Sequence, residues 1–273
     1  MQPAVAMTIA GSDSGGGAGA QADLRTFAAF GVHGTSALTA LTAQNTYEVR
    51  AVDLVDPEFV VAQAEAVLDD LAVAAVKTGM LGQRATVTAV AALAARGRLP
   101  HLVVDPVLVS STGHPLMGRG GVDAYRDALI PFARVLTPNL REAAILCGVE
   151  VEAVSSVDDM AELGRALLAL GARHVVVKGG HFQRGGATER GAPDVVVSER
   201  GVSVLDAQRV LTDNDHGTGC SLSAAIAAGL ALGRDVDDAI RDAKAFVLAA
   251  LTGAAPWHLG KGHGPIDHLG WSE

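Results

Sequence analysis

The sequence predicts an α/β protein built on a mostly parallel sheet, and two observations support that prediction. Short apolar segments alternate with segments of helical periodicity, which is typical of a right-handed parallel α/β sheet. Aromatic residues make up only 4% of the 273 residues, against 49% hydrophobic residues overall. Ala, Val and Leu must therefore fill the core, and they suit helices packed closely on a parallel sheet. Because the chain shows no repeat or linker, we expect one domain over residues 1–273.

The first half of the chain supplies strands and helices in strict alternation. Val5–Ile9 predicts a buried strand, and Gly19–Phe30 predicts a helix that ends at Gly31. Residues 33–46 are strand-like, and Asp56 with Pro57 predicts the start of the next helix. The further predicted elements are a strand and turn over 74–82, a helix over Gln83–Ala95, a strand over Leu102–Asp105, a helix over Val122–Leu129 and a strand over Val135–Thr137.

The second half continues this pattern with one departure. Helices near 140–147 and 157–170 precede a strand in "HVVVKGGH", residues 174–181. Residues 182–193 predict a polar, glycine-rich loop, and Asp194–Val197 and Val202–Leu205 predict two short strands that form a small β flap. A long Ala-rich helix then follows the glycines near residue 217, and the tail from residue 256 is expected to be irregular.

Charge and cysteine content exclude several classes of partner. The formal net charge is −9 and the basic residues form no stripe, so we expect no nucleic-acid partner. Cys147 and Cys220 lie far apart without metal-binding spacing, which is typical of reduced thiols in the cytoplasm. No secretory n-region precedes the first apolar run and no apolar stretch approaches ~18 residues, so we expect a cytoplasmic protein without a membrane partner.

Polar groups follow the predicted strands at the edge of the sheet where ligands bind. In open parallel sheets this edge is formed by the carboxyl ends of the strands. We expect polar groups from seven separate segments to converge at this edge. A structural role could explain any one of these groups, but it explains their joint placement poorly. The segments are Gly11 to Asp13, Gln44 with Asn45, residues 77–80, Asp105 with Pro106, Asn139 with Glu142, Lys178 to Gly180, and His216 to Cys220.

The first of these segments opens a glycine loop, "GSDSGGGAGA", with five glycines in residues 11–20. No Lys follows the glycines as a Walker A loop requires, and Gln44 stands where a dinucleotide site would need an acidic residue. A loop of this kind, with Asp23 one turn into the next helix, better suits a neutral, flat ligand lying against backbone. A simple tight turn remains the alternative.

The segment "DNDHGTGCSLSAAIAAGLALG", residues 213–233, is the most specific motif. Gly217, Thr218 and Gly219 precede the Ala-rich helix, so their N–H groups form an anion-binding nest at the positive end of its dipole. Phosphoryl transfer needs such fixed donors. The same helix end is expected to lower the pKa of the Cys220 thiol and make it a base. The alternative is a glycine-rich cap beside a small buried cysteine.

Two carboxylates and one lysine complete the candidate site. Asp105 ends an apolar strand, and Glu142 follows Pro138 and Asn139 after a later strand, so the pair could hold Mg²⁺ directly or through water. Asn139 and Glu142 also fit a capping box, which is a purely structural role. Lys178 is expected to aim its ammonium at the rim as an exposed residue that adds little to stability, and a snorkelling surface lysine is the alternative.

With these motifs identified, the chain resembles the hydroxymethylpyrimidine/phosphomethylpyrimidine kinases of thiamine biosynthesis, within the ribokinase-like superfamily. The likeness runs almost end to end, and "GSDSGGGAGAQAD" together with "HGTGC" is its most specific pair of motifs. Relatives that act on sugars carry Asp where Cys220 stands. One departure is Asp215, where relatives often have Thr, because a carboxylate facing the ATP phosphates would repel them.

The resemblance implies a ribokinase-like three-layer α/β/α fold, usually a homodimer. It also implies two transfers from MgATP, first to 4-amino-5-hydroxymethyl-2-methylpyrimidine and then to its monophosphate. A pyridoxal or pyridoxine kinase and a non-catalytic vitamin-precursor sensor remain the alternatives. The implied residues are Gln44, Gly11, Asp23, Met80 and Val107 for the pyrimidine, Asp105 and Glu142 for Mg²⁺, Asn139, Lys178 and Thr218 for ATP, and Cys220, Lys178, Gly217 and Gly219 for catalysis.

Overall fold

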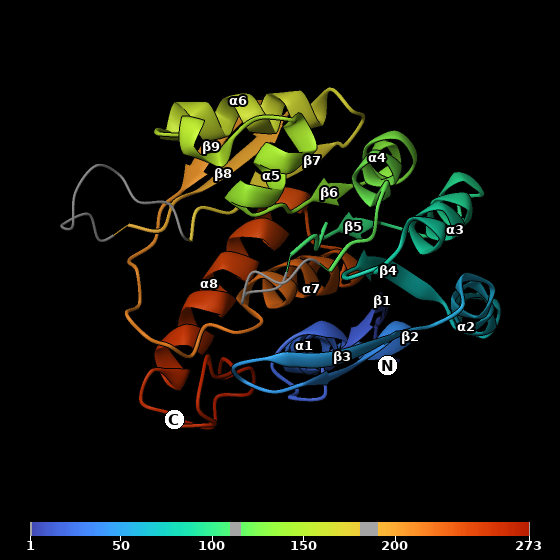
Figure 1. Ribbon diagram of the computed structural model, residues 1–273, viewed down its shortest axis with the longest axis horizontal. Coiled ribbons are helices and arrows are strands. Elements are labelled where there is room, and N and C mark those ends of the chain that lie inside the picture. The colour runs from blue at the N-terminus through green and yellow to red at the C-terminus, as the bar shows by residue number, and fades with distance from the viewer. Residues whose placement is uncertain (1, 110–115, 181–190, 273) are drawn as a thin grey trace.

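A computed structural model describes residues 2–109, 116–180 and 191–272 of the chain. Its strands are β1 (Val5–Ser12), β2 (His33–Gln44), β3 (Val49–Leu54), β4 (Val73–Thr78), β5 (Val103–Val104), β6 (Val135–Leu136), β7 (His174–Val177), β8 (Asp194–Ser198) and β9 (Gly201–Leu205). Within these described ranges they form one nine-stranded sheet in the order β3-β2-β1-β4-β5-β6-β7-β8-β9 (Figure 1). In sheet order, each pair of neighbouring strands from β2 to β7 is parallel. β3 pairs antiparallel with β2 at one edge, and the pairs β7–β8 and β8–β9 at the other edge are also antiparallel.

Helices cover both faces of this sheet. They are α1 (Gly19–Ala29), α2 (Pro57–Asp70), α3 (Arg84–Ala95), α4 (Gly121–Ala124), α5 (Leu140–Cys147), α6 (Val157–Leu168), α7 (Thr218–Ala231) and α8 (Val236–Ala254). α1, α7 and α8 share one apolar cluster with one face of the sheet, and α2 to α6 share the other cluster with the opposite face (Figure 1). The predicted three-layer α/β/α fold with a mostly parallel sheet is therefore confirmed.

Alternation along each strand supplies both cores. In β4, Ala75 faces the α7 side while Val76 faces the α3 side, and both are fully buried. In β5, Val103 belongs to the cluster on the α7 side and Val104 to the cluster on the α3 side. Burial on both faces explains why these strands appear in the sequence as continuous apolar runs.

Some elements differ from the sequence-based expectation. β3 and α8 were not predicted, and the helix expected over Val122–Leu129 is α4 followed by a π-helical turn. The strands expected as a small flap are present as β8 and β9, and they extend the central sheet beyond β7. Most of the loop predicted over 182–193 lies outside the described residues. None of the helices in the described ranges is both long enough and apolar enough to cross a bilayer.

Candidate active site

Asp13 organises the glycine loop that follows β1. Its buried carboxylate accepts hydrogen bonds from the backbone N–H groups of Gly15 at 2.8 Å, Gly17 at 3.1 Å and Ala18 at 2.8 Å. His216 Nε2 lies 2.9 Å from the same carboxylate. Burial raises the pKa of Asp13, but the His216 contact and the loop amides outweigh it and leave the pKa below its usual value. The loop is thus preorganised around the Asp13 carboxylate, which the sequence pattern places at the sheet edge without an individual role.

The glycine loop packs directly against the start of α7. A Cβ on Gly217 would lie 1.9 Å from the carbonyl oxygen of Gly17, and Gly217 has a φ of +89° as the N-cap of α7. A Cβ on Gly17 would lie 2.5 Å from Cδ2 of His216. At Gly217 only glycine fits, because the clash is with backbone, whereas at Gly17 the close neighbour is the His216 ring. This contact brings the two motifs of the sequence together at one place.

Gly11 and Met80 are neighbours at the same edge of the sheet. The Gly11 N–H donates to the Met80 carbonyl at 3.1 Å, and a Cβ on Gly11 would lie 3.3 Å from Met80 Sδ. Val107 is half-buried and its N–H donates to the carbonyl of Asp105 at 2.9 Å. These positions are compatible with the predicted pocket for a flat ring, which stays a prediction.

Gln44 is the last residue of β2 and contacts both motifs. The Ser14 hydroxyl donates to the Gln44 carbonyl and accepts from the Gln44 N–H, each at 2.8 Å. The side-chain Nε2 of Gln44 lies 3.3 Å from His216 Nε2. Gln44 is therefore held by the glycine loop through its backbone and stands beside the α7 motif through its side chain.

The start of α7 is where the sequence predicts an anion nest, which stays a prediction. The Thr218 N–H reaches the Asp215 carbonyl at 3.3 Å, and the Ser221 N–H donates to the Gly217 carbonyl at 2.9 Å. A Cβ on Gly219 would lie 3.1 Å from Lys178 Nζ, so the ammonium lies over the first turn of the helix. The helix end and the lysine thus combine two positive features at one place.

Lys178 is paired with Asp105. Its Nζ lies 2.8 Å from Asp105 Oδ1, and the hydroxyls of Thr137 and Ser223 donate to the same carboxylate at 3.3 Å each. The side chain of Lys178 is only 13% exposed and that of Asp105 is 2% exposed. The expectation of an exposed rim lysine was therefore wrong, because the side chain lies between Asp105 and the first turn of α7.

Glu142 performs the capping role and is also part of this charged cluster. Its carboxylate accepts from the Asn139 N–H at 2.8 Å, while Asn139 Oδ1 accepts from the Glu142 N–H at 2.9 Å. Burial and the nearby charge of Asp105 raise the pKa of Glu142 to about 7, although Lys178 opposes them. The capping box predicted as an alternative is thus present, and Asn139 uses its side-chain oxygen in it.

The described residues contain no group of three or more His, Cys, Asp or Glu side chains that could hold a metal ion. Mg²⁺ needs only one or two carboxylates and retains its waters. The Asp105 and Glu142 carboxylates repel each other strongly enough to raise a pKa, and a divalent cation would relieve that repulsion. The donor set therefore fits Mg²⁺ bound together with phosphate oxygens.

Cys220 differs from its sequence-based expectation. Burial raises the pKa of its thiol to about 11, and the carboxylates of Asp105 and Asp23 add to the rise. The positive charge of Lys77 and the Gly19 backbone amide lower the pKa but do not outweigh burial. The predicted thiolate at the helix end is thus wrong for the ligand-free chain, which holds a neutral thiol.

Asp23 and Lys77 form an ion pair beneath the site. Both side chains are completely buried, with Lys77 Nζ 2.8 Å from Asp23 Oδ2. Lys77 was not singled out as a functional residue, although a lysine inside the apolar strand "AAVKTG" signals a buried partner. Asp23 was predicted to line the ring pocket, and in the ligand-free chain its carboxylate is engaged by Lys77 and the Thr8 hydroxyl.

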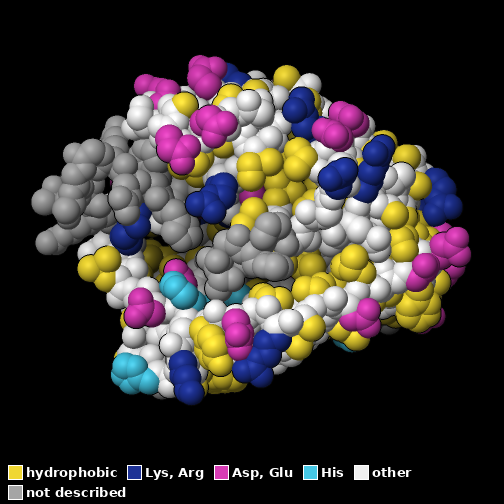
Figure 2. All heavy atoms as spheres, viewed as in Figure 1, with side chains coloured by type: hydrophobic (Ala, Val, Ile, Leu, Met, Phe, Trp, Pro, Cys, Tyr) yellow, Lys and Arg dark blue, Asp and Glu magenta, His cyan; other side chains and the backbone are white. Residues whose placement is uncertain are grey.

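Asp215 lies beside a histidine of the C-terminal tail. His263 Nδ1 is 2.8 Å from Asp215 Oδ1 at the surface of the protein. The Asp215 carboxylate is thus engaged by the C-terminal tail. Lys, Arg, Asp and Glu side chains are interspersed on the face shown in Figure 2.

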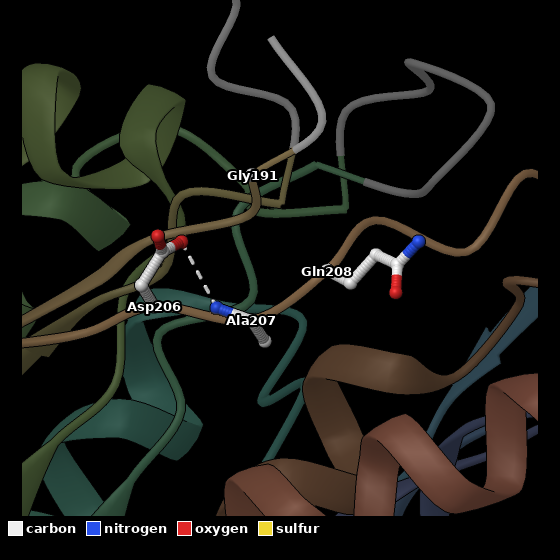
Figure 3. Close-up of a pocket in the computed structure, with 4 residues that line it drawn as sticks. All are labelled: Gly191, Asp206, Ala207 and Gln208. Atoms are coloured by element: carbon white, nitrogen blue, oxygen red, sulfur yellow. Dashed lines mark hydrogen bonds between the residues drawn. The ribbon is translucent and has the colours of Figure 1, made fainter.

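A separate cavity of about 410 Å³ lies where the chain enters β8 and leaves β9. Gly191, Asp206, Ala207 and Gln208 line it, and Figure 3 shows the Asp206 carboxylate bonded to the Ala207 N–H. The Ala192 N–H donates to the Ala207 carbonyl at 2.8 Å and closes its base. None of the predicted site residues lines this cavity.

Comparison with known proteins gives the same family as the motifs. Residues 13–267 match the family described as "Phosphomethylpyrimidine kinase". The hydroxymethylpyrimidine/phosphomethylpyrimidine kinase of Rhizobium meliloti is 47% identical over 97% of each chain. The pyridoxal kinase of Bacillus subtilis in an ADP complex superposes with a TM-score of 0.85 at 36% identity over 98% of each chain. The pyridoxal kinase of Staphylococcus aureus in complex with AMP-PCP and pyridoxal gives a TM-score of 0.87 at 31% identity, over 100% of this chain and 96% of that one.

The family match, the near-complete overlap with a named kinase and the ribokinase-like fold agree with the resemblance found in the sequence. The chain therefore belongs to the phosphomethylpyrimidine kinase family.

Proposed function

We propose that this chain is a MgATP-dependent kinase that phosphorylates 4-amino-5-hydroxymethyl-2-methylpyrimidine and then its monophosphate. The observation that supports this most directly is the backbone contact between Gly17 and Gly217. It places a glycine-rich wall suited to a flat ring against a helix end suited to a phosphoryl group. The single continuous sheet supports one kinase domain over residues 1–273.

The residues divide into a ring side and a phosphate side. Gln44 pairs with the ring through its amide, while Gly11, Met80 and Val107 enclose the ring and Asp23 lies beneath it. The N–H groups at Gly217, Thr218 and Gly219 receive the charge that develops on the transferred group, and Lys178 shares that charge. Asn139, together with Thr218 and Lys178, contacts ATP. Asp105 and Glu142 would hold Mg²⁺, which supplies charge neutralisation of the phosphates when bound.

Cys220 stands at the junction of the two sides. As a base it would take the proton of the substrate hydroxymethyl group while the substrate oxygen bonds to the γ-phosphorus and ADP leaves. The thiol is neutral in the free chain, so its pKa must fall when the site is loaded. Charge neutralisation at Asp105 removes one cause of the high pKa and works in that direction.

A pyridoxal kinase is the second candidate, because two solved structures of similar fold are named pyridoxal kinases. A non-catalytic sensor of vitamin precursors is the third. A coupled assay of ADP release with ATP and hydroxymethylpyrimidine, its monophosphate or pyridoxal separates the three. We expect turnover of both pyrimidines at much higher kcat/KM than pyridoxal. Turnover of pyridoxal alone would replace the proposal by the second candidate, and no turnover of any ring would leave the sensor.

Cys220→Ala tests the assigned chemistry in the same assay. We expect kcat to fall by about 10²–10⁴-fold, as for loss of a general base, while ATP affinity stays unchanged. A variant that turns over at the parent rate would remove Cys220 from the mechanism and leave the helix-end donors as the catalytic device.

We also propose a homodimer in the cytoplasm, which rests on the resemblance to the family. Sedimentation equilibrium of the purified chain tests the assembly, and a monomer at micromolar concentration would contradict it.

A further inference from the structure

His216 lies between the ring side and the phosphate side of the site. It directly precedes Gly217, and its Nε2 is near two groups, Asp13 Oδ2 at 2.9 Å and Gln44 Nε2 at 3.3 Å. One ring nitrogen therefore faces a carboxylate and an amide nitrogen at once. The position of the proton on this nitrogen decides what each neighbour can do.

The carboxylate of Asp13 places the hydrogen on Nε2 of His216. The pKa of Asp13 is lowered, so the group is an anion and only accepts hydrogen bonds at neutral pH. A bare lone pair on Nε2 would face that anion at 2.9 Å and be repelled. An N–H at Nε2 instead makes a charge-assisted hydrogen bond in a largely buried place, where the His216 side chain is 12% exposed.

With its hydrogen given to Asp13, Nε2 of His216 has no lone pair for the Gln44 amide. The 3.3 Å contact is then steric and not a hydrogen bond, so it limits where the Gln44 side chain can lie without using its hydrogen-bonding capacity. Ser14 also fixes the backbone of Gln44 at its N–H and its carbonyl. The Gln44 side chain is therefore restrained at its base by Ser14 and at its amide by His216. Its –NH₂ and its carbonyl oxygen stay available for a ligand.

We propose that His216, held by Asp13, is a positioning residue that presents the Gln44 amide to the substrate and thereby selects a ring with an acceptor nitrogen beside an exocyclic amine. This inference rests on the proposed function and assigns its ring selectivity to residues behind Gln44. Loss of the Asp13 contact would free Nε2 to accept from Gln44, which would capture the amide and weaken ring binding.

The test is calorimetric titration of hydroxymethylpyrimidine in the absence of nucleotide. His216→Phe keeps a flat ring against Gly17 but has no N–H for Asp13, so the side chain no longer fixes the Gln44 amide. We expect pyrimidine binding to weaken by about tenfold, as for one lost hydrogen bond between Gln44 and the substrate. His216→Gln retains a terminal N–H that can reach Asp13 and is expected to bind within about threefold of the parent. Affinity for Mg-AMP-PCP should stay within about twofold in both variants.

A double-mutant cycle with Gln44→Ala separates positioning from general damage. If His216 acts through Gln44, adding His216→Phe to Gln44→Ala should weaken ring binding by less than about twofold further. The matched control is His263→Phe, which removes the other histidine–aspartate contact of this region, with Asp215, and should leave ring affinity unchanged. If the Phe variant lacks a cooperative melt, His216→Asn, too short to reach Asp13, replaces it with the same expectations.

The outcomes distinguish the inference from the proposed function. Additive losses in the cycle, unchanged ring affinity in His216→Phe, or an equal loss of nucleotide affinity would each overturn the role of His216. A parent chain that neither binds nor phosphorylates hydroxymethylpyrimidine overturns the proposed function, and the inference falls with it.

Discussion

Lys77 and Asp23 form a fully buried ion pair close enough to Cys220 to influence its thiol. Nζ of Lys77 lies 3.0 and 2.8 Å from the two carboxylate oxygens, and neither side chain is exposed to solvent. A Cβ on Gly79 would lie 2.8 Å from that Nζ, so the chain leaves room for the ammonium. A buried pair is weak evidence for stability, because desolvation opposes the attraction. Its two charges act on the Cys220 thiol in opposite directions.

Lys77→Met and Asp23→Asn should therefore shift the pKa of Cys220 in opposite directions. Removing the ammonium raises the pKa above about 11, and removing the carboxylate lowers it. A shift of one unit changes the thiolate fraction about tenfold. The rate of Cys220 alkylation by iodoacetamide across pH measures this, in a Cys147→Ser background.

Lys244→Met is the control for this pair. It breaks a similar pair, Lys244 with Asp194 at 2.8 Å, on α8 and β8. It should lower the free energy of unfolding without changing the alkylation profile of Cys220. Shifts of the same sign in Lys77→Met and Asp23→Asn would show that the pair acts only through the fold.

These charges also show how far the sequence alone could predict the site. The glycine loop and the HGTGC segment could be recognised in the sequence because each depends on local backbone geometry, and the structure brings them into contact. The Lys77–Asp23 pair spans 54 positions, and its partners meet because α1 packs on β1, the neighbour of β4 in the sheet. The local helix dipole predicted a low pKa for Cys220, whereas burial and carboxylates from distant segments decide it. β3 was missed because its sequence, VRAVDL, shows no apolar–polar alternation and most of its residues are exposed.

Lys178→Met should lower both catalysis and stability. The lysine compensates Asp105 in a place that is almost closed to water, so its loss leaves a buried carboxylate unpaired. We expect the free energy of unfolding to fall by ~3–5 kcal/mol, the usual effect of breaking a buried pair. We expect kcat to fall by at least ~10²-fold, because a charge on the transferred phosphoryl group is lost. Urea unfolding and steady-state kinetics measure the two effects.

Lys178→Arg keeps the charge and should restore most of the stability but less of the rate, because the ammonium position over Gly219 changes. If Lys178→Met were as stable as the parent, Lys178 would behave like the exposed lysine that the sequence predicts.

Glu142 should make the metal-free protein less stable as the pH rises. Its folded pKa of about 7 is above the ordinary value of 4.5, so between these values the folded state binds more protons than the unfolded state. Stability from this group is therefore lost as pH rises from about 4.5 to about 7, by ~1–3 kcal/mol. Urea unfolding at pH 5 and pH 8 without Mg²⁺ measures the slope, and Glu142→Gln should remove it.

Added Mg²⁺ provides an independent check on Glu142. If the ion binds the Asp105 and Glu142 pair, millimolar Mg²⁺ with AMP-PCP should stabilise the parent at pH 8 more than Glu142→Gln. Equal stabilisation of both proteins would argue against Glu142 as a metal ligand.

His268 should produce the opposite pH dependence. It is buried in the tail with Nε2 2.8 Å from the Ser221 hydroxyl, in the first turns of α7. Burial, with a contribution from the charge of Arg25, lowers its pKa to about 4 from the ordinary 6.5. The unfolded state thus binds the extra proton between these values, and stability is lost as pH falls from about 6.5 to about 4.

In that window the contribution of Glu142 changes in the other direction, so the two slopes partly cancel in the parent. Glu142→Gln should therefore expose a steeper loss of stability on acidification, and adding His268→Gln should flatten it again. Denaturant midpoints at half-unit steps from pH 4 to pH 7 measure all three proteins, and a Glu142→Gln variant with the parent slope would contradict the assignment of both groups.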